Sequence, residues 1–294
     1  MDSYHTVKKV VIHFVQENVF DRFRPTEVNP TRTVGSGPFP WYDSVWLANY
    51  ESVRQWLRSE RPQGIYEFER KLAVLQTSQD FQTQFFPSVL SDVALASVRS
   101  VIAGLRPANL QLHEAATFRR FIVQDHPTLT DLQRSLLPLV SKAVGEQVEI
   151  GYNFVSLYGT KGVCPIHMDA PEAKWTLDVC IDQSAPWPIH FSRVQPWPES
   201  VPELAHETRA SRSEEAQASL TFDTYSLEPG QAVLFSGSSQ WHYRDTMLNS
   251  GSKDFCHLVF FHFIPAGSME LIDQKNWRRL FDLGNFDWPQ GSGN

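Results

Sequence analysis

The second half of the chain consists of short β-rich segments with no helical stretch between them. Residues 148–154 alternate between large apolar side chains and polar residues or glycine, which is the period of a half-buried strand. Seven further candidate strands follow, at about Cys164 to Asp169, Trp175 to Ile181, Trp187 to Phe191, Ser219 to Leu227, Gln231 to Phe235, Gln240 to Tyr243 and Phe255 to Ile264. Eight short strands without intervening helices favour a closed barrel or a sandwich over a parallel α/β sheet.

The first half of the chain has a helical pattern instead. Apolar residues recur at helical spacings within residues 45–57, 68–75, 89–105, 112–123 and 130–144. Residues 24–40 are rich in proline and glycine and are expected to form a loop. A closing helix is expected over residues 268–284. The predicted fold class is therefore α+β, with a mainly helical region over residues 1–147, a β-rich core over 148–265, and a C-terminal helix and tail over 266–294.

One polar segment interrupts the β-rich half. Residues 196–218 show neither helical nor strand periodicity. A structureless insertion of this length in a compact domain is usually a functional lid or a disordered loop. We expect a lid insertion here.

Two histidines and one aspartate are the residues best suited to carry chemistry. In a strand, residues two apart point to the same face, so His167 and Asp169 can converge on one metal ion. His242, near the entry of a later strand, is the best candidate for a third ligand. Two imidazoles and one carboxylate form the facial triad of non-haem Fe(II) oxygenases, which leaves the opposite face of the metal open.

These parts together resemble the Fe(II)/2-oxoglutarate-dependent oxygenases. The matching pieces are His167-Met168-Asp169, the turn Pro229-Gly230 followed by an apolar strand to Phe235, and His242. The resemblance implies a double-stranded β-helix, or jelly roll, over about residues 148–265. It implies that His167, Asp169 and His242 bind Fe(II), with 2-oxoglutarate and O₂ as cosubstrates. Since the carboxylate of Asp169 is present, the resemblance also implies hydroxylation of a C–H bond rather than halogenation.

The resemblance also suggests residues that hold 2-oxoglutarate. Enzymes of this family anchor its far carboxylate with a basic residue, often about ten positions after the distal histidine. Lys253 and Arg244 are the favoured candidates here, and His257 in the last strand is a third. Tyr158 and Thr176 are further candidates for hydrogen bonds to the cosubstrate.

Composition argues against two classes of partner, nucleic acids and membranes. The chain has 33 acidic and 26 basic residues and a net charge of −7, so a nucleic-acid partner is not expected. No apolar run approaches the length of a membrane-spanning helix, and no membrane association is expected. Three scattered cysteines are most simply free thiols in a reducing cytoplasm. The oligomeric state is not readable from the sequence.

The expected substrate is a small molecule, such as an amino acid or a natural-product intermediate. An alternative within the same superfamily is a hydroxylase of protein or peptide side chains, which would need an open groove. An alternative from another class is a cupin-like metal-binding barrel without 2-oxoglutarate chemistry. Such barrels usually bring three or four histidines to the metal, and Asp169 argues against them.

Overall fold

The structure is a computed structural model that describes residues 44–197, 220–247 and 254–288. The proline-rich segment at 24–40, nearly all of the expected lid and Lys253 lie outside these ranges. Within them, no helix has the length and apolar character needed to cross a membrane.

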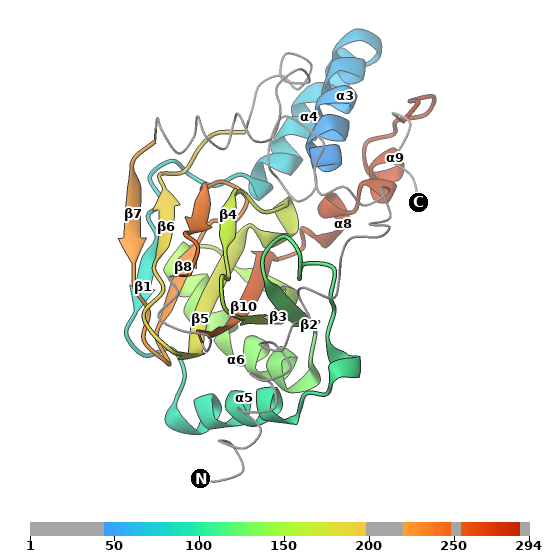
Figure 1. The fold of residues 1–294 in the computed structure, drawn as a ribbon. Coiled ribbons are helices and arrows are strands. Elements are labelled where there is room, and N and C mark those ends of the chain that lie inside the picture. The colour runs from blue at the N-terminus through green and yellow to red at the C-terminus, as the bar shows by residue number, and fades with distance from the viewer. Residues whose placement is uncertain (1–43, 198–219, 248–253, 289–294) are drawn as a thin grey trace.

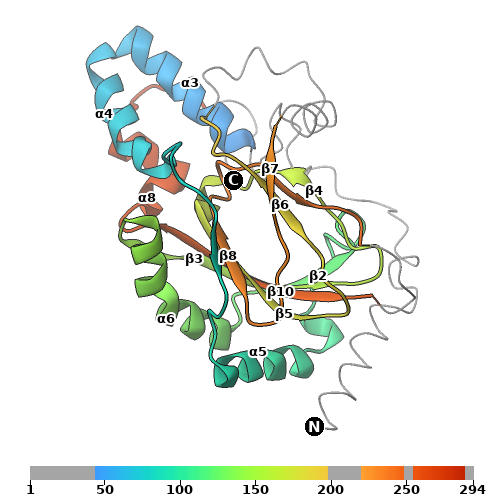
Figure 2. The same ribbon diagram turned by 90° about the vertical axis from the view of Figure 1, so that its left-hand side faces the viewer.

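Two antiparallel sheets form the centre of the molecule (Figures 1 and 2). All eight expected strands are present, as β3 Val148–Tyr158, β4 Cys164–His167, β5 Trp175–Gln183, β6 Ile189–Ser192, β7 Phe222–Tyr225, β8 Ala232–Phe235, β9 His242–Arg244 and β10 Cys256–Pro265. Two earlier strands, β1 Gln84–Phe86 and β2 Arg120–Gln124, join them. The larger sheet has the order β1-β8-β5-β10-β3-β2, and the smaller has the order β4-β9-β6-β7.

The larger sheet is buried on both faces. Its outer-face residues, such as Val155 and Val259, pack with residues of two helices, α5 Asp92–Gly104 and α6 Pro127–Val144. Its inner-face residues, such as Cys180 and Leu258, pack with Phe191 of the smaller sheet. The two sheets therefore enclose a common interior, and alternation along each strand decides which side chains enter it.

A second apolar cluster lies beside the sheets. The helices α3 Ser44–Glu60 and α4 Pro62–Leu72 pack against the short C-terminal helices α8 Met269–Ile272 and α9 Trp277–Leu280 (Figure 1). The predicted single helix over 268–284 is wrong, because Asp273 breaks it. The backbone of Asp273 is extended, and its side chain accepts a hydrogen bond from Lys275 N, which starts a new 3₁₀ turn over residues 274–276.

The predicted helix over residues 112–123 is also wrong. The segment consists of turns followed by β2, and the strand lies between Arg119 and Asp125, which both adopt positive φ angles. Phe121 and Val123 belong to the outer core, whereas the pairing of Arg120 with Tyr158 places Arg120 on the inner face. The apolar residues in this short run fit either period, and pairing with β3 selects the strand.

A buried glutamine joins helix α6 to the sheet at a bulge. The register between β10 and β3 shifts between Phe261 and Phe263, which frees the carbonyl of His262. The Gln133 side chain, which is fully buried, donates to His262 O at 2.8 Å and to Tyr152 O at 3.0 Å. This contact fixes the end of β10 at which His262 lies.

Replacing Gln133 with leucine should therefore destabilise the fold. Two buried carbonyls would lose their donor, and each unsatisfied buried group costs about 1–3 kcal/mol. We expect the free energy of unfolding, measured by urea titration, to fall by about 2–6 kcal/mol. Arg134→Leu at the next position is the control, since that side chain is exposed and pairs with the exposed Asp131. Equal stabilities for the two variants would contradict this role.

Candidate metal centre

The structure brings His167, Asp169 and His242 together in the interior between the sheets. His167 ends β4 and pairs directly with His242, the first residue of β9. His167 Nε2 lies 3.4 Å from Asp169 Oδ1, and His242 Nε2 lies 3.7 Å from Asp169 Oδ2. One ligand atom from each residue lies within 4.8 Å of the others, and all three residues are buried. Ligands bound at right angles to one ion at about 2.1 Å are about 3 Å apart, so this donor set fits a single transition-metal ion.

Backbone carbonyls orient both imidazoles. His167 Nδ1 lies 2.7 Å from Pro165 O, and His242 Nδ1 lies 2.9 Å from Gln240 O. A carbonyl oxygen can only accept, so each Nδ1 carries the proton and donates. Each Nε2 is then left toward the carboxylate, which is the arrangement that metal-binding histidines need.

The charges at the triad also suit a cation. Burial opposes the ionised form of Asp169, but the neighbouring His242 and His167 hold its pKa well below the usual range. Burial and the charge of His167 lower the pKa of His242 to about 4, so this imidazole is neutral at pH 7. Although burial acts in the opposite direction, Cys164 and Asp169 raise the pKa of His167 to about 10. A metal cation would displace that proton.

Gly237 leaves room for the carboxylate of Asp169. Its carbonyl accepts a hydrogen bond from Asp169 N at 2.8 Å. A Cβ atom at this position would lie 2.4 Å from Asp169 Oδ2, 2.5 Å from Ala173 O and 2.9 Å from Thr176 Oγ1. The two closest of these contacts are far inside van der Waals distance, and one involves backbone. Only glycine fits here without moving the triad carboxylate.

Gly237→Ala is therefore expected to weaken metal binding while the sheets still form. Displacing a group that orients a metal ligand typically costs 10–100-fold in affinity. We expect a loss of this size for Fe(II) in an anaerobic titration, with an unchanged far-ultraviolet circular dichroism spectrum. Gly104→Ala is the control, because a Cβ there would meet nothing within 4 Å. Wild-type affinity in Gly237→Ala would contradict the close approach.

A second polar cluster lies on the inner face at the opposite end of the strands. Cys164 of β4 lies three residues before His167 and pairs with Arg244 of β9. Arg244 therefore lies away from the triad end of the two strands. Arg244 Nη2 contacts Asp178 Oδ2 at 2.7 Å, and its Nη1 donates to Trp187 O. Arg120 Nη1 donates to the Tyr158 hydroxyl at 2.8 Å. Two buried arginines thus lie at the far end of the interior from the triad.

Several buried polar atoms of the inner face have no partner within the described part of the chain. They are Ser156 Oγ of β3, Asp178 Oδ1 of β5 and His262 Nε2 of β10. Unsatisfied buried polar groups are costly and call for an explanation such as a bound ligand or water. These atoms leave hydrogen-bonding capacity in the interior that a bound ligand or water could use.

The residues expected to hold the cosubstrate do not lie together in the structure. Thr176 lies at the triad end, and its hydroxyl is 2.9 Å from His262 Nδ1. Tyr158 and Arg244 lie at the far end of the interior. His257 pairs with Leu157, whose side chain belongs to the outer core, so His257 lies on the other face of the sheet from the triad.

Sequence reasoning assigned no role to Asp178 or Gly237. Asp178 had a usable signal, since it is a charged residue in the middle of an apolar strand and must have a partner there. Gly237 had none, because its importance comes from residues more than 60 positions away that the fold brings against it.

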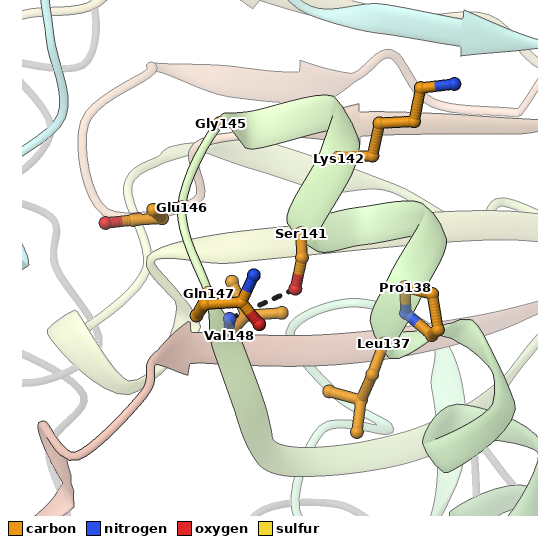
Figure 3. A pocket seen from close by; sticks show the side chains of 8 residues that line it. All are labelled: Leu137, Pro138, Ser141, Lys142, Gly145, Glu146, Gln147 and Val148. Carbon is orange, nitrogen blue, oxygen red and sulfur yellow. Dashed lines mark hydrogen bonds between the residues drawn. The ribbon is translucent and has the colours of Figure 1, made fainter.

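A surface pocket outside the interior lies where α6 meets β3 (Figure 3). Ser141 Oγ accepts a hydrogen bond from Val148 N at 3.2 Å there. Glu146 is engaged by Lys174 Nζ at 2.8 Å and by Trp175 Nε1 at 2.5 Å. These polar groups hold the connection between α6 and β3, and the chemistry-bearing groups lie at the triad instead.

Comparison with known proteins gives matches among solved structures only. No family model and no curated protein matches the chain. HygX from Streptomyces hygroscopicus, solved with nickel and 2-oxoglutarate bound, is 13% identical with a TM-score of 0.45, covering 67% of this chain and 87% of HygX. EctD from S. alaskensis, solved with bound Fe, is 12% identical with a TM-score of 0.44, covering 62% of this chain and 72% of EctD.

A third similar structure is SnoN, a non-haem α-ketoglutarate-dependent epimerase from nogalamycin biosynthesis. It is 15% identical with a TM-score of 0.44, covering 63% of this chain and 78% of SnoN. The resemblance expected from the His-x-Asp…His pattern is thus confirmed as a resemblance. Likenesses at these scores assign no activity to this chain, so its function has to rest on the geometry of the site.

Proposed function

We propose that the chain is an Fe(II)- and 2-oxoglutarate-dependent oxygenase that oxidises a C–H bond of a small molecule. The observation that carries the proposal is the convergence of two oriented imidazoles and one ionised carboxylate in a buried interior. This donor set leaves one face of the metal open for a chelating cosubstrate and O₂. Fe(II) loaded with 2-oxoglutarate supplies the oxidising power, and the protein supplies ligation, orientation and a water-poor cavity.

The strand arrangement supports a double-stranded β-helix. Of the eight strands from β3 to β10, four belong to each sheet, as in a jelly roll. The triad lies at one end of the interior, where β4 ends and β9 begins. Ligand sites in barrels of this kind lie in the mouth. We place the catalytic core over residues 148–265.

We assign metal binding to one end of the interior and binding of the far carboxylate of 2-oxoglutarate to the other. His167, Asp169 and His242 hold the metal at one end. Arg244 at the other end is proposed to bind the far carboxylate of 2-oxoglutarate, with the Tyr158 hydroxyl beside it. A guanidinium is suited to this task because it offers several donors in a fixed plane. Asp178 keeps Arg244 ionised and in position, since it contacts Arg244 at 2.7 Å.

We also propose the type of oxidation, hydroxylation, and the cellular compartment, the cytoplasm. Hydroxylation is the expected outcome because Asp169 occupies the carboxylate position of the triad. The similar structures include an epimerase, so product analysis has to distinguish hydroxylation from other oxidations. The three cysteines are free and buried, which fits a reducing cytoplasm.

An anaerobic titration with Fe(II) and 2-oxoglutarate tests the proposal. We expect the weak visible charge-transfer band of the chelate to appear in the wild-type protein. Admission of O₂ should then release succinate. Bound iron without the band would indicate a cupin-like enzyme that does not use 2-oxoglutarate. Absence of iron binding would overturn the enzymatic proposal and leave a structural or ligand-binding barrel.

A further inference from the structure

The turn between β8 and β9 lies against two of the three triad residues. It covers residues 236–240, all of which are buried. The Gly237 carbonyl accepts a hydrogen bond from Asp169 N at 2.8 Å, and the Gln240 carbonyl accepts one from His242 Nδ1 at 2.9 Å. The positions of these two carbonyls therefore help to determine where Asp169 and His242 lie.

The Gln240 side chain closes this turn. Gln240 N donates to Ser236 O at 2.9 Å, and Ser236 N donates back to Gln240 Oε1 at 2.9 Å. One backbone bond and one side-chain bond thus join the two ends of the turn, with Gly237 between them. A buried N–H group without an acceptor is costly, so loss of the side-chain bond should move the backbone of the turn.

The amide nitrogen of the same side chain anchors the turn to both sheets. Gln240 Nε2 donates to Ser192 O, at the end of β6, at 2.8 Å. It also donates to Thr83 Oγ1, just before β1, at 3.1 Å. An amide nitrogen carries two hydrogens, so both are used. Since β6 belongs to the smaller sheet and β1 to the larger, the side chain fixes the turn relative to both.

His167 is oriented by a different contact. Its Nδ1 lies 2.7 Å from Pro165 O, within its own strand β4. The three hydrogen-bond partners of the Gln240 side chain all lie outside β4. Loss of the Gln240 amide should therefore displace His242 while the contact that orients His167 remains.

We propose that Gln240 is a positioning residue of the metal centre, whose side-chain amide holds in place the two carbonyls that orient His242 and Asp169. Its side chain acts through the backbone of the turn. This inference rests on the proposed function, because it takes the triad as a metal site. Loss of an outer hydrogen-bond partner of a metal ligand typically costs about 10–100-fold in metal affinity.

Gln240→Met tests the proposal, because methionine has a similar length and no N–H group to donate. The dissociation constant for Fe(II) alone would be measured in an anaerobic titration. We expect it to be about tenfold higher than for wild type. Trp241 N donates to Ser192 Oγ at 3.0 Å, and Ser192 N donates to Trp241 O at 2.8 Å. Neither bond involves the Gln240 side chain, so β6 and β9 should still pair in this variant.

Gln133→Met is the matched control. Gln133 is also a buried glutamine with three side-chain hydrogen bonds, so its replacement should destabilise the fold in a similar way. Its partners belong to β3 and β10 rather than to the turn, so its Fe(II) affinity should equal that of wild type. Equal Fe(II) affinities in Gln240→Met and Gln133→Met would overturn the proposal.

A spectroscopic readout separates positioning from general loosening of the site. At saturating Zn(II), proton NMR would follow the Nδ1–H groups of His242 and His167. Contacts with the rings of Phe235 and Phe118, whose centroids lie 4.8 Å and 6.2 Å from the respective imidazoles, would assign them. In Gln240→Met the His242 resonance should shift or exchange faster with solvent, whereas the His167 resonance should stay. Equal changes in both, or no change in either, would contradict the positioning role.

A second variant does not depend on the folding of Gln240→Met. Thr83→Val lies outside the turn and removes only one acceptor of Gln240 Nε2. The His242 resonance should move in the same direction, but less, with the His167 resonance unchanged. An unmoved His242 resonance would count against anchoring by the amide.

Metal binding by wild type separates the two levels of failure. A wild-type protein that binds neither Fe(II) nor Zn(II) would count against the proposed function. A wild-type protein that binds metal, with Gln240→Met behaving like Gln133→Met, would count against this inference alone.

Discussion

Asp169→Ala is expected to abolish Fe(II) binding at the triad and all release of succinate from 2-oxoglutarate. Asp169 is the only carboxylate of the metal-ligand set found among the described residues, and it contacts both histidines. Loss of a residue that only orients a ligand costs 10–100-fold in metal affinity, so loss of the ligand itself should cost about a hundredfold or more. The measurement is the anaerobic titration followed by succinate assay.

Asp245→Ala is the matched control for this variant. The Asp245 side chain is 73% exposed and lies 3.6 Å from His190 Nε2, so its removal also takes a carboxylate away from a histidine. It should leave the charge-transfer band and succinate release unchanged. Full turnover in Asp169→Ala would remove Asp169 from the triad.

Arg244→Met is expected to destabilise the fold strongly and also to weaken binding of 2-oxoglutarate. Arg244 and Asp178 form an ion pair in which both side chains are almost fully buried. Removing one partner leaves an unpaired buried charge, which typically costs about 3–5 kcal/mol. The free energy of unfolding from urea titration and the dissociation constant of 2-oxoglutarate would be measured together.

A double variant separates the two effects. In Arg244→Met with Asp178→Leu, neither charge remains, and replacing a buried pair by apolar residues is often neutral for stability. The stability should therefore return toward wild type, whereas affinity for 2-oxoglutarate should stay low because the guanidinium is absent. A double variant with wild-type affinity would show that the far carboxylate binds elsewhere, with Arg120 and Lys253 as the next candidates.

Prediction from the sequence worked best where the pattern was local. The eight strands from β3 to β10 were expected because apolar residues with a period of two report which face of a strand is buried. The same reasoning failed for β2, since its run of three apolar residues, 121–123, fits a helix or a strand until a neighbouring strand pairs with it. The break at Asp273 was missed because a side-chain hydrogen bond to a nearby backbone N–H competes with the helix.

The sequence by itself determined the chemical types at the centre: a His-x-Asp pair at the end of one strand and a later histidine after an apolar strand. Strand periodicity predicted that His167 and Asp169 share a face, but β4 ends at His167, and Asp169 lies just after it with its backbone N–H bonded to Gly237 O. Only the tertiary structure decided which other groups meet them, because Arg244, Asp178, Gly237 and His262 come from separate strands and loops. Their positions depend on register and on a bulge in β3 opposite His262, and a shift of one residue would turn each side chain to the opposite face.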